Sequence, residues 1–221
     1  MEDGIKKIAY DNGADVCGIG SIERFDDFPK GFSPKDIWFQ CKSVISLGIA
    51  LPKGLLNVNS NLIYGYYNEM ICTKLDEMLL KTAKEIEEQY DCHAVPMPSN
   101  IPYEYWDAEN MTGKGLLSMK HVAVACGLGE LGKSTLLLNK QFGNRLVVGA
   151  ILTNLRLESD PVVSGLCLTT CSNCIDNCPV KAISDGHVNQ KLCRQNTYST
   201  NEKGFATTEC NMCRALCPWA L

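Results

Sequence analysis

The chain has 221 residues, of which 45% are hydrophobic, so it has enough apolar side chains to form a folded core. Its 25 acidic residues outnumber 21 lysines and arginines, and the net charge of −4 excludes a general positive field for nucleic acid. Residues 1–7 lack the features of a signal peptide, and no apolar run reaches the roughly 18–20 residues of a membrane span. We therefore expect a soluble, cytoplasmic protein with no membrane and no nucleic-acid partner.

The spacing of apolar residues predicts a mixture of helices and strands. Residues 2–12 and 60–90 have helical spacing, whereas 16–19, 43–51 and 93–95 are typical of buried strands. The run 43–51 is the best candidate for a central strand because it is long and β-rich. The apolar positions of the long helix are Ile63, Tyr67, Ile71, Leu75, Met78, Leu79 and Ile86.

A second helix start lies at Ser33 and Pro34. Serine is a favoured N-cap, and proline suits the first helical position because its missing N–H needs no partner there. The helix that follows is predicted to bury Ile37, Trp38 and Cys41.

Residues 96–113 form a long segment rich in proline and aromatic residues. We interpret this segment as a loop, because its prolines interrupt any regular pattern. Long aromatic loops beside a compact body often bind ligands, and a surface or dimer contact is an equally good interpretation.

The 13 cysteines are distributed unevenly. Five are scattered over the first 166 residues, and eight lie within the last 55. A disulfide framework is disfavoured because cytosolic thiols stay reduced, so the clustered cysteines indicate metal or redox chemistry. The eight are Cys167, Cys171, Cys174, Cys178, Cys193, Cys210, Cys213 and Cys217.

Residues 171–179 and 210–218 are two copies of the pattern Cys-x2-Cys-x3-Cys-Pro. In bacterial ferredoxins the last cysteine of such a run binds the other of two [4Fe-4S] clusters. Two clusters need eight thiolates, and the tail holds eight. The pattern predicts one cluster on Cys167, Cys171, Cys174 and Cys217, and a second on Cys178, Cys193, Cys210 and Cys213.

One spacing departs from the ferredoxin pattern. Three residues separate Cys167 from Cys171 where two are usual, and Gly165 could allow the looser turn. A pair of zinc ribbons and a [3Fe-4S] first cluster are the alternatives that we weigh, and both are disfavoured against two [4Fe-4S] clusters.

Residues 127–135 match the phosphate-loop pattern G-x4-G-K-[ST]. Such a loop follows a strand, and the alternation in 121–126 would fit one. It must also open a helix, whereas 135–152 predicts a strand, a turn at Gly143 and Asn144, and a second strand. We therefore disfavour a nucleotide triphosphatase.

A combination of motifs resembles a known family. The glycine-rich run 127–139, the segment 149–155, and the two cysteine motifs together resemble epoxyqueuosine reductase and the related reductive dehalogenases. The resemblance covers most of the chain.

The resemblance implies an α+β protein with two parts: a nitroreductase-like cofactor-binding domain over residues 1–160, and a bacterial-ferredoxin-like double [4Fe-4S] domain over 161–221. It implies a bound cobalamin, with flavin mononucleotide (FMN) as the alternative cofactor. It also implies that residues 121–126 are helical. The residues that it places at the cofactor are Gly127, Leu128, Gly129, Gly132, Lys133, Ser134, Thr135 and Asn139.

The same resemblance places cofactor-facing residues near the start of the long helix. Tyr64, Tyr66 and Tyr67 are therefore candidate catalytic proton donors, with core or rim packing as the other interpretation. The family's catalytic carboxylate has no counterpart in 95–100, and the sequence stops at Leu221, without the family's tRNA-binding repeats.

Together these features predict an oxidoreductase that passes electrons through two [4Fe-4S] clusters to cobalamin for a reductive reaction on a small substrate. The alternatives are a flavin-containing iron–sulfur reductase, an electron carrier, and an activator that reduces a corrinoid protein. A low-potential donor such as ferredoxin or flavodoxin would be its electron-transfer partner.

Overall fold

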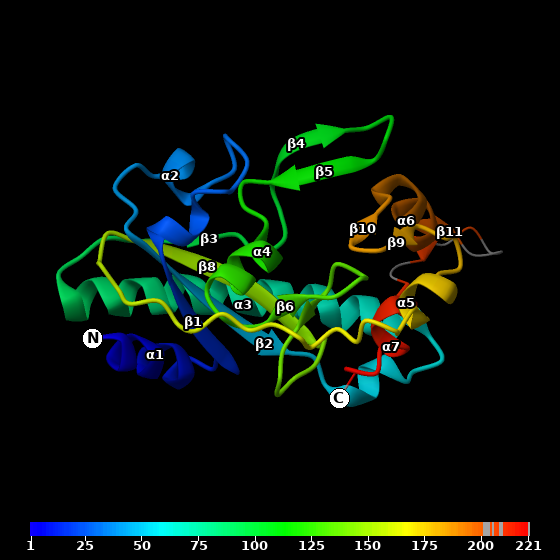
Figure 1. The fold of residues 1–221 in the computed structure, drawn as a ribbon, viewed down its shortest axis with the longest axis horizontal. Coiled ribbons are helices and arrows are strands. Elements are labelled where there is room, and N and C mark those ends of the chain that lie inside the picture. The colour runs from blue at the N-terminus through cyan, green and yellow to red at the C-terminus, as the bar shows by residue number, and fades with distance from the viewer. Residues whose placement is uncertain (201–203, 205, 208–209, 221) are drawn as a thin grey trace.

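The computed structural model describes residues 1–200, 204, 206–207 and 210–220. Its centre is an antiparallel sheet with strand order β1-β2-β8-β3 (Figure 1). These strands are β1 (Val16–Ser21), β2 (Ser43–Ala50), β8 (Leu146–Thr153) and β3 (Ala94–Met97).

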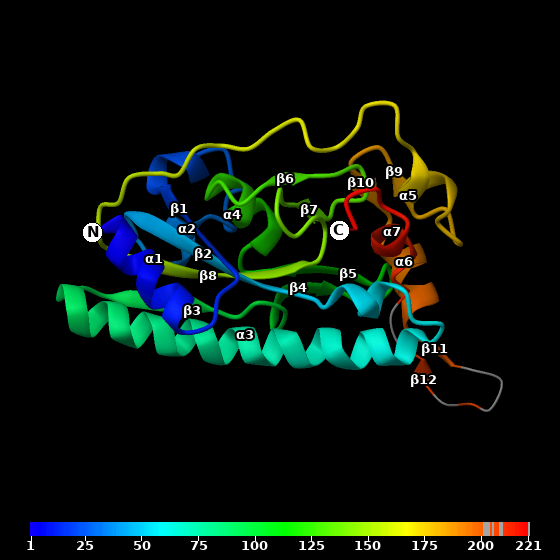
Figure 2. The same cartoon turned by 90° about the horizontal axis from the view of Figure 1, so that it is seen from below.

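One face of the sheet is covered by α1 (Glu2–Asp11) and α3 (Asn61–Tyr90), as Figure 2 shows. Ile45, Leu47 and Ile151 point into this layer and are fully buried. Their burial against the apolar faces of the two helices supplies the main hydrophobic stabilisation of this half of the molecule.

The opposite face packs against α4 (Met119–Ala125), η1 (Ile22–Phe25) and α2 (Pro34–Ile37). Val44 and Leu152 are fully buried in this second layer. Because neighbouring residues of a strand point to opposite faces, the all-apolar run of β2 is explained by helices on both sides.

A segment that follows β8 crosses back over α4 towards the tail (Figure 2). Asp160 fixes it: its Oδ2 accepts from the Ile19 N–H at 2.8 Å, its own N–H donates to Ile19 O at 2.8 Å, and its Oδ1 lies 2.5 Å from Lys6 Nζ. The free edge of β1 is thus paired with this crossing segment.

The remaining elements are short. Two hairpins precede β8, and a second 3-10 turn, η2 (Lys53–Leu56), precedes α3. The hairpins are formed by β4 (Tyr103–Asp107) with β5 (Thr112–Gly115), and by β6 (Glu130–Leu131) with β7 (Leu137–Leu138). The tail has α5 (Asn173–Asp176), β9 (Ile183–Ser184), β10 (His187–Val188), α6 (Gln190–Thr197), β11 (Ser199–Thr200), β12 (Ala206–Thr207) and α7 (Met212–Ala215).

The mixed α+β class and the main predicted elements are confirmed. The helices at 2–12 and 60–90 and the strands at 16–19, 43–51 and 93–95 are present within a few residues, and β2 lies inside the sheet. The structure describes no helix with the length and apolar character needed to cross a bilayer.

Two local predictions were wrong. The alternation in 121–126 suggested a strand, but these residues lie in and just after helix α4, as the family resemblance implied. A short apolar run fits both periods, and packing against β2 and β8 decides in favour of the helix. The loop predicted over 96–113 contains the first strand of the β4–β5 hairpin.

The segment 135–152 was predicted only in part. A turn does occur at Gly143, whose φ is 59°. However, β7 pairs with β6 and not with β8, because β8 is already flanked by β2 and β3. The glycine-rich loop is followed directly by strand β7 and not by a helix. It therefore lacks the helix that a phosphate loop must open.

Burial was also predicted imperfectly. Ile63 and Tyr67 were placed on the buried face of the long helix, but both side chains are exposed, because the first turns of α3 extend beyond the sheet. Helix α2 ends at Ile37, so Cys41 reaches the core from the turn that follows.

Replacing Gly18 with alanine should destabilise the fold. A Cβ at this position in β1 would lie 2.2 Å from Cys126 O at the end of α4, so the strand and the helix would have to separate. We expect a loss of about 1–3 kcal/mol in the free energy of unfolding, measured by urea denaturation. The matched control is Gly54→Ala, where no atom lies within 4 Å of the new Cβ. Equal denaturation midpoints for the two variants would contradict this packing.

Candidate functional site

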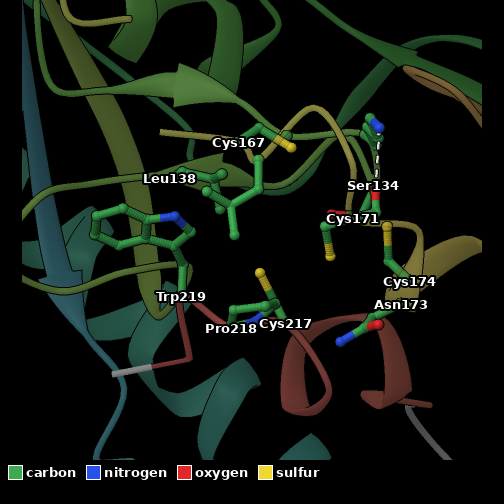
Figure 3. Close-up of a pocket in the computed structure, with 12 residues that line it drawn as sticks. Ser134, Leu138, Cys167, Cys171, Asn173, Cys174, Cys217, Pro218 and Trp219 are labelled. Atoms are coloured by element: carbon green, nitrogen blue, oxygen red, sulfur yellow. Dashed lines mark hydrogen bonds between the residues drawn. The ribbon is translucent and has the colours of Figure 1, made fainter. Parts of the chain in front are cut away.

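Four cysteines surround a small cavity between the glycine-rich loop and the tail (Figure 3). We call Cys167, Cys171, Cys174 and Cys217 the first quartet. Leu138, Pro218 and Trp219 form apolar parts of its wall. Burial raises the pKa of Cys174, and the other three thiols of the quartet raise it further. Four thiols this close together resist deprotonation, because the resulting negative charges would repel one another, unless a bound cation compensates them.

The other four tail cysteines also lie together, and we call Cys178, Cys193, Cys210 and Cys213 the second quartet. Burial raises the pKa of Cys193, to which the nearby thiols of Cys210 and Cys178 add. Burial raises the pKa of Cys213 to about 11, against the opposing effect of Arg214. The Ala182 N–H donates to the Cys178 sulfur at 3.2 Å.

The two quartets exchange one cysteine each. Cys178 ends the first sequence motif but lies in the second quartet, and Cys217 ends the second motif but lies in the first. The quartets are neighbours, since Cys174 is close enough to raise the pKa of Cys213 and packs in the same apolar group. The structure therefore gathers the cysteines in the same two sets that the sequence pattern predicts.

Among the described residues, no three histidine, cysteine or acidic side chains are placed to hold a single metal ion. The first quartet surrounds a space instead of meeting at one point (Figure 3).

The tail is anchored to the body by buried polar contacts. Asn144, next to the turn at Gly143, donates from Nδ2 to Arg214 O at 2.8 Å, and its N–H donates to Trp219 O at 3.0 Å. Arg214 returns a hydrogen bond to Asn144 O. Trp219 Nε1 donates to Leu166 O at 2.5 Å. These contacts hold the ends of the cysteine-rich tail against the loop that precedes β8.

The first part of the glycine-rich loop is filled by the protein itself. A Cβ on Gly129 would lie 1.9 Å from Leu138 O, and one on Gly127, whose φ is 77°, would lie 2.6 Å from Pro161 O. Leu128 is buried in the core, and Asn139 Nδ2 donates to Leu128 O at 2.7 Å. Internal packing therefore accounts for these four of the predicted cofactor residues.

The second part of the loop reaches the first quartet. Gly132, Lys133 and Ser134 line its cavity, and Lys133 Nζ donates to Thr169 O at 2.7 Å and to Cys171 O at 3.1 Å. Thr135 adopts a φ of 60°, and its Oγ1 lies 3.4 Å from Lys120 Nζ.

A much larger cavity, of about 650 Å³, lies above the N-terminal end of α4. This volume is typical of sites for small organic ligands. Its wall combines aromatic and cationic side chains, and Asp27 is the one carboxylic acid among the described residues that line it. The residues that line it are Arg24, Asp27, Phe28, Pro29, Phe32, Gly113, Lys114, Gly115, Ser118, His121 and Gln190. No local sequence pattern indicates these residues as a group, because they come from three segments far apart in the chain: 24–32, 113–121 and 190.

His121 has a defined hydrogen bond in this cavity. Its Nδ1 lies 2.6 Å from Ser118 Oγ, which leaves Nε2 for a ligand. Burial lowers the pKa of His121, and the Lys120 ammonium lowers it further. Both effects favour the neutral imidazole.

Helix α6 joins the large cavity to the second quartet. Gln190 lines the cavity, accepts from the Gly113 N–H at 3.0 Å and donates to Gly113 O at 3.3 Å. Arg194 lies over the rings of Tyr103 and Trp106, at 5.3 and 5.0 Å from their centroids. Cys193 of the second quartet lies on the same helix, between these two contacts.

The β4–β5 hairpin is also fixed on its other side. Lys114 Nζ lies 5.6 Å from the ring centroids of both Phe32 and Tyr105, and so bridges the hairpin and the segment after η1. Residues 113–115 of this hairpin thus form one wall of the large cavity, and the rings of Tyr103, Tyr105 and Trp106 are exposed at the surface.

The candidate tyrosines lie outside both cavities. Tyr64 is buried with 5% exposure, whereas Tyr66 is 61% exposed and its ring makes an edge contact with Tyr67. None of the three lines the large cavity or that of the first quartet.

Comparison with curated proteins finds relatives named epoxyqueuosine reductase. No protein-family model matches the chain. An epoxyqueuosine reductase of Lactococcus garvieae is 34% identical over 121 residues, which is 49% of this chain and 34% of that protein. One of Bacillus anthracis is 26% identical over 208 residues, covering 87% of this chain and 52% of the relative. The chain thus spans at most about half the length of these two relatives.

Solved structures show the same fold. An epoxyqueuosine reductase from Streptococcus thermophilus has a TM-score of 0.71 at 21% identity, over 100% of this chain and 66% of that one. A reductive dehalogenase described in terms of B12-dependent dehalogenation has a TM-score of 0.69 at 20% identity, over 99% of this chain and 31% of the other. The resemblance to these two kinds of protein, indicated by the motifs, is confirmed.

Replacing Arg194 with alanine should loosen the β4–β5 hairpin. The variant loses the guanidinium stacked on Tyr103 and Trp106 and its 3.1 Å hydrogen bond to Tyr103 Oη. We expect local opening to become easier by about 1–2 kcal/mol, so that amide exchange across residues 103–115 is roughly 5–30-fold faster. The control is Gln195→Ala, an exposed position on the same helix. Equal exchange rates in the two variants would show that the hairpin is held without Arg194.

Proposed function

We propose that this chain, with its likeness to epoxyqueuosine reductases, is an iron–sulfur oxidoreductase core that passes electrons through two [4Fe-4S] clusters to a bound organic cofactor for a reductive reaction on a small substrate. The observation that carries the proposal is the arrangement of the eight tail cysteines in two adjacent quartets, with Cys178 and Cys217 exchanged. A crossed arrangement of this kind is what two clusters require of the repeated motif.

The residues present fit two clusters. The first quartet would hold one [4Fe-4S] cluster and the second quartet the other. Burial and the neighbouring thiols raise the pKa of Cys174 and Cys217 in the first quartet and of Cys193 and Cys213 in the second, and metal binding would remove that penalty. Adjacent N–H groups, such as that of Ala182 on Cys178, can stabilise the sulfur ligands.

The proposed domains follow from this assignment. Residues 1–160 would form a nitroreductase-like cofactor-binding domain, and residues 161–221 a bacterial-ferredoxin-like domain. The central sheet between α-helical layers and the repeated cysteine motif support this division.

The large cavity is the proposed site of the organic cofactor. Cobalamin is the first candidate, supported by the B12-dependent dehalogenase among the structural neighbours. A bound corrinoid supplies a redox-active metal that transfers electrons to a substrate. FMN is the alternative, supported by a cavity of about 650 Å³ that combines aromatic walls with Arg24 and Lys114.

The chain's own side chains have separate roles in this cavity. Phe28 and Phe32 provide apolar walls that exclude water, while Arg24 and Lys114 provide positive charge. Asp27 and Nε2 of His121 are the groups that can hold and deliver a proton. Gln190 keeps the hairpin wall in contact with the helix of Cys193.

A low-potential protein such as ferredoxin or flavodoxin is the proposed electron donor, and a small molecule or a corrinoid protein the proposed acceptor. Cytoplasmic location, and the absence of nucleic-acid and membrane partners, remain proposals based on composition.

Anaerobic purification should yield about eight irons and eight sulfides per chain, because each cubane has four of each. Cys167→Ser should impair the first cluster and Cys193→Ser the second, so each variant should lose one cluster's electron paramagnetic resonance (EPR) signal. The measurements are iron and sulfide quantitation, EPR of the reduced protein, and chromophore extraction to identify a corrinoid or a flavin.

About two zinc ions per chain in place of iron would contradict the central proposal. Loss of neither signal in Cys167→Ser would show that another group completes the first cluster.

The chain should not restore queuosine in a cell that lacks epoxyqueuosine reductase. Segment 95–100 has no carboxylate, and Asp27 enters the cavity from a different part of the fold. A positioned acid typically contributes about 10²–10⁴-fold in rate, and the net charge of −4 disfavours phosphate contacts. The measurement is the queuosine content of tRNA after expression of the chain. Restoration at ordinary expression would assign the relatives' activity to this protein.

A further inference from the structure

The second quartet is surrounded by nitrogen-bearing side chains that lack anionic partners. Lys120 from α4, Asn211 just before α7 and Arg214 within α7 all adjoin its cysteines. Within the described residues, no carboxylate forms an ion pair with Lys120 or Arg214. Buried positive charge without a counter-ion is costly, so this arrangement indicates that an anionic group belongs beside it.

Asn211 gives an independent indication. Its side chain is only 5% exposed, and among the described residues its Nδ2 has no hydrogen-bond partner. Its backbone is fixed, because Asn211 O accepts from the N–H groups of Arg214 and Ala215. A buried amide donor without an acceptor is unfavourable, so an acceptor is expected between Cys210 and Cys213, which flank Asn211.

Lys120 is held at the same place by the glycine-rich loop. Its Nζ lies 3.4 Å from Thr135 Oγ1, close to the limit of a hydrogen bond, which leaves most of its donor capacity free. Negative charge on the thiols of Cys213 and Cys193 would favour the charged form of Lys120. Thr135, the last residue of the Gly-Lys-Ser-Thr run 132–135, thus positions Lys120 and needs no nucleotide to explain its presence.

The first quartet is different. Lys133 Nζ already donates to two backbone carbonyls, those of Thr169 and Cys171. Asn144 Nδ2 is likewise satisfied by Arg214 O. The nitrogen donors at the first quartet therefore already have acceptors. Lys120 and Asn211 at the second quartet still have N–H groups that can donate to a further acceptor.

We propose that Lys120 and Asn211 raise the reduction potential of a cluster in the second quartet, making it the electron acceptor of the pair. This inference rests on the proposed function. Positive charge and N–H···S hydrogen bonds favour the state with one more electron. The step would be the transfer of one electron from a cluster in the first quartet, itself reduced by a low-potential donor, to a cluster in the second quartet; the first cluster is oxidised, the second is reduced, and no bond forms or breaks. The more oxidising cluster would then be the one nearer the large cavity, on the side of α6.

The test is an EPR-monitored potentiometric titration of the anaerobically purified full chain. Cys193→Ser identifies the signal of the second cluster. Lys120→Met and Asn211→Leu should each make that cluster harder to reduce, by about tenfold in the reduction equilibrium, or 59 mV for one electron. Lys120→Arg, which keeps the charge, should restore most of the potential.

Lys133→Met is the matched control, since it removes an ammonium from the first quartet and should shift only the first cluster. Should Asn211→Leu lose iron, Asn211→Asp keeps the side-chain shape, removes the amide donor and should lower the potential further. Eight irons with an unchanged second potential in both Lys120→Met and Asn211→Leu would overturn this inference alone. A preparation without iron would overturn the proposed function as well.

Discussion

Eight thiols, seven of them partly buried and one fully, are gathered in a tail that has almost no apolar core of its own. The apolar group of the tail is built on Cys178, Ala182 and Ile183, and helices α5 and α7 have four residues each. Elements this short cannot bury enough surface to be stable alone, and mutual repulsion opposes charging of the thiols. The proposed clusters would supply the missing stabilisation, because binding to a site absent from the unfolded chain is itself folding free energy.

The body of the protein positions this tail through polar contacts at each end. Asp160 secures the crossing segment to β1, and Asn144 holds Arg214 and Trp219 near the C-terminal end. Both anchors are buried or partly buried and each makes more than one hydrogen bond, which fixes the geometry more strictly than apolar contact would. The two quartets are therefore presented at a defined position beside α4 and α6.

Helix α6 connects three features that lie far apart in the sequence. Gln190, Cys193 and Arg194 are spaced so that one short helix contacts the wall of the large cavity, the second quartet and the aromatic hairpin. A change of ligand in the cavity that moves the hairpin would therefore act on the surroundings of Cys193. The aromatic residues of the hairpin have a structural role here, because Arg194 stacks on the rings of Tyr103 and Trp106.

The sequence by itself determined the long helix of residues 61–90, the central strand 43–50 and the division of the tail cysteines into two sets, because these depend on local period and spacing. Only the tertiary structure decided the helix at 119–125, where a short apolar run fits two periods. It also decided the exposure of Ile63 and the membership of the large cavity. This cavity brings together side chains from separate parts of the chain, among them Arg24, Lys114, His121 and Gln190. A local sequence pattern cannot predict that they lie together, because this depends on how the helices, the hairpin and the tail pack around the sheet.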